Sequence, residues 1–129
     1  MQTITLEHVY LSVVDLDRTL AFYRRLFPDW IIRWEGKRPD GRWVHFGAPG
    51  DGQPNYLSLA EHPGAVAATE PYTTVGPQHV GFAHPDVDAL IARLAPAIKP
   101  TDYVDDGHYR RAYFQDPDGI ELEVVQRLG

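Results

Sequence analysis

Two histidines and one glutamate in this sequence have the residue types of a divalent metal site. His8 and His79 begin two similar stretches, "HVYLSVVDLDRTLAFYRRLF" and "HVGFAHPDVDAL". Glu123 lies with Glu121 in a later stretch, "DPDGIELEVVQ". Imidazole nitrogens and carboxylate oxygens bind Fe, Mn, Ni and Zn, and two imidazoles with one carboxylate leave further positions on the ion for a substrate. A metal site would require the fold to bring these three residues together.

The first histidine begins a βαβββ pattern. Alternation in "HVYLSVV" predicts a strand with His8, Tyr10 and Ser12 on one face and apolar residues on the other. Asp15 has the type and place of a helix N-cap, and Pro28 ends the helical spacing that follows. Three strand-like runs come next, "DWIIRWEG", "RWVHFGA" and "NYLSLAE".

The second histidine begins the same order of elements. A strand is followed by a helix after the N-cap Asp86, and then by the runs "TDYVDD", "RRAYFQ" and "IELEVVQ". The residues Asp116 to Gly119 predict a tight turn between the last two strands. On the last strand, alternate apolar residues face the helix, which places Glu121 and Glu123 on the opposite face.

The repeat predicts the fold class. Each unit has a helix for only one face of its sheet, so the two sheets should curl together around a shared concave surface. We expect an α+β fold in which two βαβββ modules form a cupped mixed sheet with helices on the outer face. The expected organisation is a single domain over 1–129, with a first module at 4–61, a linker at 62–77 and a second module at 78–127.

Composition narrows the possible functions. The sequence has no cysteine, which excludes disulfides, thiolate metal sites and a cysteine nucleophile. Its formal net charge of −6 repels phosphate backbones, so we expect no nucleic-acid partner. No long apolar run is present, and we expect a cytoplasmic protein that does not bind membranes.

The stretches that begin at His8, His79 and Asp116 resemble the vicinal oxygen chelate superfamily, and the resemblance covers nearly the whole chain. That superfamily includes glyoxalase I, extradiol ring-cleaving dioxygenases, fosfomycin resistance enzymes, methylmalonyl-CoA epimerase and bleomycin resistance proteins. The resemblance implies a small-molecule substrate and a divalent metal (Fe, Mn, Ni or Zn) held by His8, His79 and Glu123. It also implies a homodimer in which the first module of one chain faces the second module of the other, so that each site is shared.

One position departs from the glyoxalase-like members. They usually carry a fourth ligand, Glu or Gln, where this chain has Ser58, and a serine hydroxyl is a poor ligand. The remaining set resembles the two-His, one-Glu site of extradiol dioxygenases and fosfomycin enzymes. Tyr113 matches the tyrosine that precedes the turn in extradiol enzymes and is the candidate catalytic residue; the alternative is a structural tyrosine. The histidine that accompanies it there has only His108 as a candidate, at too short a spacing.

Three residues are candidates for substrate binding. His45 alternates with two apolar neighbours and would act as an acid or base or fill the fourth ligand position; the alternative is an ordinary surface histidine. Arg111 suits an anionic substrate, and its alternative is an ion pair with Glu121. Tyr10 shares the strand face of His8. Three tryptophans are candidates for an aromatic pocket wall, or for core and dimer contacts: Trp30, Trp34 and Trp43.

These features lead to three classes of function. The first is a metalloenzyme in which the ion chelates two neighbouring substrate oxygens as a Lewis acid. The missing fourth ligand favours extradiol dioxygenase-like chemistry, whereas the short chain with one pair of modules favours a glyoxalase-type lyase or isomerase. The second is a drug-binding protein like those of bleomycin resistance, which generally lack the full ligand set. The third is an inactive scaffold that retains the ligands.

Overall fold

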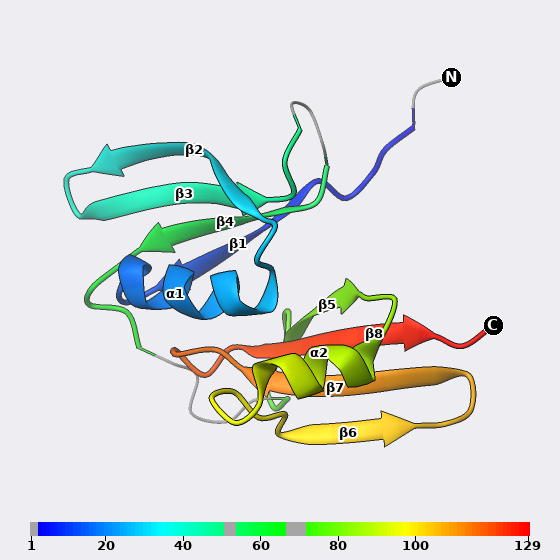
Figure 1. Ribbon diagram of the computed structural model, residues 1–129. Coiled ribbons are helices and arrows are strands. Elements are labelled where there is room, and N and C mark those ends of the chain that lie inside the picture. Colours follow the sequence, from blue (N-terminus) through cyan, green and yellow to red (C-terminus); the bar gives the residue numbers. More distant parts are fainter. Residues whose placement is uncertain (1–2, 51–53, 67–71) are drawn as a thin grey trace. The chain divides into compact units, whose positions relative to one another are not determined.

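The structure is a computed structural model that describes residues 3–50, 54–66 and 72–129 (Figure 1). The chain divides into two compact units, Met1–Val66 and Ala67–Gly129. We call them the first and the second module. Within the described residues, each contains one four-stranded mixed sheet and one helix in the order βαβββ, which confirms the predicted α+β fold.

In the first module, the first and the last strand are neighbours in the sheet. The strand order is β1-β4-β3-β2, with β1 parallel to β4 and the other neighbours antiparallel. The elements are β1 (His8–Val13), α1 (Leu16–Leu26), β2 (Ile31–Arg38), β3 (Gly41–Gly47) and β4 (Tyr56–Glu61).

The second module repeats this topology. Its strand order is β5-β8-β7-β6, and again the first and last strands of the module are parallel neighbours. The elements are β5 (His79–Ala83), α2 (Val87–Leu94), β6 (Asp102–Asp105), β7 (Tyr109–Gln115) and β8 (Glu121–Arg127).

Both helices begin at the predicted N-caps. The carboxylate of Asp15 accepts a hydrogen bond from the backbone N–H of Arg18 at 3.1 Å, and Asp86 accepts one from Ala89 at 3.0 Å. Such a cap is worth about 1 kcal/mol, because it satisfies an N–H that has no partner inside the helix. Neither of the two helices that the described residues form is long and apolar enough to cross a membrane.

The core of each module lies between its helix and one face of its sheet. Because side chains alternate along a strand, the neighbours of the core residues point to the opposite face, which we call the helix-free face. The predicted alternation, with core residues facing the helix and their neighbours on the helix-free face, is correct on β1, β3, β7 and β8. Core residues that are at most 5% exposed include Val13, Leu20, Tyr23, Val44, Phe46 and Leu59 in the first module, and Val87, Leu90, Ala112, Phe114, Leu122 and Val124 in the second.

The predicted turn between β7 and β8 sets the register of the second module. The buried carboxylate of Asp116 accepts hydrogen bonds from the backbone N–H groups of Asp118 at 2.8 Å and Ile120 at 2.9 Å. Gly119 has φ of +81°, a conformation that glycine adopts without steric cost, and donates to the Asp116 carbonyl. The resulting hairpin places Tyr113 opposite Glu123.

Candidate metal centre

The second module brings two of the three predicted metal ligands together. His79 and Glu123 lie on the parallel neighbours β5 and β8, and His79 Nε2 is 3.0 Å from Glu123 Oε2. The carboxylate is the less accessible of the two, since the Glu123 side chain is 13% exposed and that of His79 is 36% exposed. Both side chains occupy the helix-free face.

This separation fits two ligands of one ion. Divalent transition metals bind nitrogen and oxygen at about 2.1 Å, so two such donors lie about 3.0 Å apart at the right angle of an octahedral site and about 3.4 Å apart at a tetrahedral angle. The donor types, neutral imidazole and carboxylate, are also those that divalent transition metals prefer. The same separation equally allows a direct hydrogen bond from His79 Nε2 to Glu123.

Arg111 also binds the glutamate of this pair. Its Nε is 3.1 Å from Glu123 Oε1, and its Nη1 is 2.9 Å from Asp106 Oδ2. The alternative that paired Arg111 with Glu121 was wrong: the antiparallel register makes Glu123 its diagonal neighbour. Hydrogen bonds from the Tyr109 backbone and from Arg111 lower the pKa of Asp106 to about 2, so this anchor of the guanidinium stays ionised.

Tyr113 lies beside the pair on the same face. Its ring centroid is 6.3 Å from that of His79 in an edge-on arrangement, and its backbone is opposite Glu123. Burial and then the charge of Glu123 raise the pKa of the Tyr113 hydroxyl, which therefore stays protonated and able to donate. His108 is placed differently, in the turn between β6 and β7, where its backbone N–H donates to Asp106.

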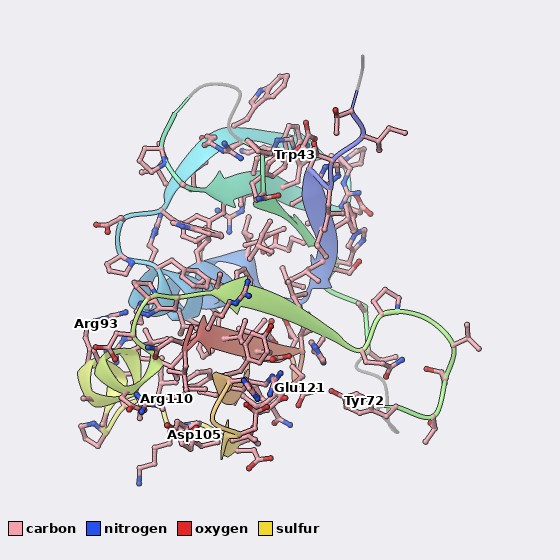
Figure 2. All side chains as sticks on the ribbon, turned by 90° about the vertical axis from the view of Figure 1, so that its right-hand side faces the viewer. Trp43, Tyr72, Arg93, Asp105, Arg110 and Glu121 are labelled. Atoms are coloured by element: carbon pink, nitrogen blue, oxygen red, sulfur yellow. The ribbon has the colours of Figure 1, made fainter. Side chains whose placement is uncertain are left out.

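The other ring nitrogen of His79 contacts a residue that the sequence did not indicate as a site candidate. His79 Nδ1 is 3.2 Å from the hydroxyl of Tyr72, and that hydroxyl donates a hydrogen bond to Glu121 Oε2. Figure 2 shows Tyr72 and Glu121 directed toward each other. Tyr72 lies in the segment predicted as a linker, where its residue type alone gives no signal of a contact with β5.

In the first module, His8 has a comparable environment. Its Nδ1 is 3.0 Å from Glu7 Oε1, and the same oxygen accepts a hydrogen bond from the Tyr56 hydroxyl at 3.1 Å. The imidazole also stacks on the Tyr56 ring, with centroids 4.9 Å apart. The hydrogen bonds from His8 and then Tyr56 lower the pKa of Glu7, which keeps this carboxylate charged.

An aromatic row extends from Tyr56 across the helix-free face of the first module. His45 stacks on Tyr56 at 4.5 Å between centroids, Trp43 lies 5.2 Å from His45, and Trp34 lies 6.2 Å from Trp43. Trp34 is 67% exposed, so its ring is available for contact. Burial, followed by the charge of His8, lowers the pKa of His45, which favours its neutral form.

Two predicted residues lie outside this row. Trp30 stacks on Phe27 with centroids 4.4 Å apart and belongs to the packing after α1. The hydroxyl of Tyr10 is 2.8 Å from His62 Nε2, which Arg38 Nη2 also approaches at 3.2 Å. Tyr10 is thus on the predicted face, but its hydroxyl is already hydrogen-bonded at the end of β4.

Ser58 occupies the position in the first module that Glu123 occupies in the second. Strand register pairs Ser58 with Tyr10 on β1 and with His45 on β3. The corresponding register pairs Glu123 with a residue of β5 and with Tyr113 on β7. Ser58 is 7% exposed, so the missing fourth carboxylate lies at a nearly buried position.

Restoring that carboxylate gives a testable prediction. Ser58→Glu should bind a divalent metal more tightly than the wild type, because it adds an anionic ligand on the helix-free face that also carries His8. Without metal it should be less stable, on the order of 1–3 kcal/mol, because a carboxylate is buried without a partner. Calorimetric titration and thermal unfolding, with and without Zn²⁺, measure both effects. Ser58→Gln is the neutral control of equal size, and an equal gain in both variants would contradict the prediction.

Each module contributes part of the predicted ligand set. Across the ranges that the structure describes, no three His, Asp or Glu side chains form a cluster that could hold a metal ion. The second module joins His79 to Glu123, and the first module contributes His8. A complete three-ligand site therefore stays a prediction that requires a first and a second module to face each other.

The comparisons with known proteins agree with this architecture. Residues 5–124 match the model of the Glyoxalase/Bleomycin resistance protein/Dioxygenase superfamily. No curated protein matches the chain. A glyoxylase/bleomycin resistance protein/dioxygenase domain from Frankia sp. EAN1pec is 27% identical, with a TM-score of 0.78 over 98% of this chain and 99% of that one.

Two further solved structures share the fold at lower identity. The trypanothione-dependent glyoxalase I of Leishmania major is 23% identical, with a TM-score of 0.76 over 96% of this chain and 87% of that one. TnmS3, an antibiotic-binding protein from Streptomyces sp. CB03234, is 21% identical, with a TM-score of 0.70 over 98% of each chain. With the family model matching most of its length, this chain belongs to the Glyoxalase/Bleomycin resistance protein/Dioxygenase superfamily.

Proposed function

We propose that the protein is a metal-dependent enzyme acting on a small aromatic substrate that has two neighbouring oxygens. His8, His79 and Glu123 would hold one divalent ion, Fe, Mn, Ni or Zn. The observation that carries this proposal is the pair formed by His79 Nε2 and Glu123 Oε2, 3.0 Å apart beside Tyr113. When bound, the ion would supply Lewis-acid polarisation of the substrate oxygens.

The chain's other residues have distinct roles in this proposal. Tyr113 donates a hydrogen bond to a substrate oxygen, since its raised pKa keeps the hydroxyl protonated. Arg111 fixes the orientation of Glu123 through the ion pair at 3.1 Å. Trp34 and Trp43 supply a surface on which a planar ring can stack, which favours an aromatic substrate.

Within this class we favour extradiol dioxygenase-like chemistry over glyoxalase-type lyase or isomerase chemistry. Ser58 stands where a fourth protein carboxylate would be, so fewer protein atoms would surround the ion. More positions then remain for a bidentate substrate and a further small molecule. The aromatic row supports the same preference, because ring cleavage requires an aromatic substrate.

We further propose a homodimer with shared sites. Each module covers one face of its sheet with a helix and leaves polar ligand candidates on the other. In the dimer the first module of one chain faces the second module of its partner. His8 then comes from one subunit, and His79 with Glu123 from the other.

A second candidate function is metal-free binding of an aromatic small molecule. Both carboxylate oxygens of Glu123 already have cationic or hydrogen-bonding partners, Arg111 at 3.1 Å and His79 at 3.0 Å. Such a triad is satisfied without an ion. The exposed ring of Trp34 would serve ligand stacking equally well in a protein that only binds.

Metal analysis of protein purified without a histidine tag separates the two functions. We expect the enzyme to gain about 2.7 kcal/mol in unfolding free energy at a metal concentration of 100 times its Kd. Thermal unfolding with Fe²⁺, Mn²⁺, Ni²⁺ or Zn²⁺ measures this gain, and oxygen uptake with a catechol then tests the dioxygenase assignment. Metal binding without oxygen uptake would favour the lyase or isomerase. No gain with any metal would favour the binding protein.

A further inference from the structure

Each candidate ligand histidine has at Nδ1 one member of a hydrogen-bonded tyrosine–glutamate pair. At His79, the Tyr72 hydroxyl lies 3.2 Å from Nδ1 and donates to Glu121. At His8, Glu7 Oε1 lies 3.0 Å from Nδ1 and accepts from the hydroxyl of a second tyrosine, Tyr56, at 3.1 Å. The two arrangements differ only in which member of the pair contacts the ring.

The internal repeat does not account for this similarity. Strand register places Tyr56 opposite His8 in the first module and Glu121 opposite His79 in the second. Equivalent positions thus supply the tyrosine in one module and the glutamate in the other. The missing member comes in each case from a different part of the chain, Glu7 before β1 and Tyr72 before β5. Two independent sources for the same pair indicate that the pair itself has a role.

The backbone around Tyr72 is arranged to deliver its hydroxyl. Tyr72 has φ of +67°, a left-handed conformation that is unfavourable for a residue with a bulky side chain. Its N–H donates to the side-chain oxygen of Gln78 at 2.6 Å. The Gln78 side-chain nitrogen donates in turn to the carbonyls of Thr74 at 2.9 Å and Gly76 at 3.0 Å. Figure 2 shows Tyr72 and Glu121 near each other at the start of this segment.

We infer that the Tyr72–Glu121 and Tyr56–Glu7 pairs are positioning residues that keep the proton of each histidine on Nδ1 and leave the Nε2 lone pair for a metal. The inference rests on the proposed function. An acceptor at Nδ1 fixes the tautomer and the ring orientation of a metal-binding histidine, and raises its basicity. The Tyr72 hydroxyl donates to Glu121, so its oxygen is available to accept from His79 Nδ1.

Zinc affinity tests the inference in the second module. Tyr72→Phe removes the hydroxyl and should weaken Zn²⁺ binding by about 10- to 100-fold, the range for loss of an outer partner of a ligand. Tyr103→Phe is the matched control, because it removes a tyrosine hydroxyl that donates to Asp88 at 2.9 Å in the same module. The control should bind Zn²⁺ like the wild type. Equal losses in both variants, or no loss in Tyr72→Phe, would overturn the inference.

The tautomer of His79 gives a second readout that needs no metal. Nitrogen-15 NMR of the zinc-free protein, about two pH units above the ordinary histidine pKa of about 6.5, should show a population of the Nδ1–H form in the wild type, in competition with the Nε2–H form. Tyr72→Phe and Glu121→Gln should both move it toward the Nε2–H form, which donates to Glu123. An unchanged tautomer in both variants would overturn the inference. A shifted tautomer in a protein that does not bind Zn²⁺ would support the positioning pair while refuting the proposed metal site.

Discussion

Replacing Glu123 with alanine is expected to remove most of the bound metal while the protein stays folded. Glu123 is the only carboxylate among the three proposed ligands, so its loss removes both a donor atom and the anionic charge. The effect should exceed the 10- to 100-fold weakening expected for an outer partner. The fold should survive because Arg111 keeps its ion pair with Asp106 at 2.9 Å. Metal content after dialysis and calorimetric titration with Zn²⁺ measure the loss.

Asp105→Ala is the matched control for this change. Asp105 is also a strand-borne carboxylate, and it pairs at 3.0 Å with Arg110, the neighbour of Arg111 on β7. Removing it breaks an equivalent ion pair on the same sheet without touching a proposed ligand. We expect normal metal content in the control. Normal metal content in Glu123→Ala would refute the ligand set.

The fold could be predicted because two local signals agree along the chain. Alternation around His45 put Val44 and Phe46 on the core side, and both are at most 3% exposed. The N-caps at Asp15 and Asp86 fixed where each helix begins. Period-two alternation and capping depend on neighbouring residues only, so they can be recognised without knowing the tertiary structure.

The contacts of the site depend on more than local pattern. The alternation of side chains along the strands placed Arg111, Glu121 and Glu123 on one face. It could not decide which glutamate forms the ion pair with Arg111. The hairpin register decides it, because Arg111 lies diagonal to Glu123. Tyr72 was missed for a different reason: its approach to Glu121 depends on the folded path of residues 72–78, which has no period.

The internal repeat allowed residues of the two modules to be compared position by position. Matching register in the two modules makes Ser58 the counterpart of Glu123 and His45 the counterpart of Tyr113. Duplicated backbones with different side chains at equivalent positions allow one module to supply a carboxylate and the other an aromatic surface.

Because the proposed ligands come from both modules, two inactive variants with substitutions in different modules should form intact sites when they are mixed. His8→Ala removes the ligand of the first module and Glu123→Ala removes one from the second, so each variant alone should be inactive. In a dimer that contains one chain of each kind, one shared site carries both substitutions and the other carries neither. Random mixing makes half of the dimers mixed, and about a quarter of all sites should become intact.

Metal titration of the mixture, after subunit exchange, measures the recovery. Exchange is checked first by mass spectrometry of the intact dimers, with one chain isotopically labelled. Recovery near a quarter of the wild-type metal capacity would support sites shared between subunits. No recovery in confirmed mixed dimers would mean that each chain closes its own first module onto its own second module. In that case His8 and Glu123 must act within one chain, and the Glu123→Ala result would still report on the ligand set.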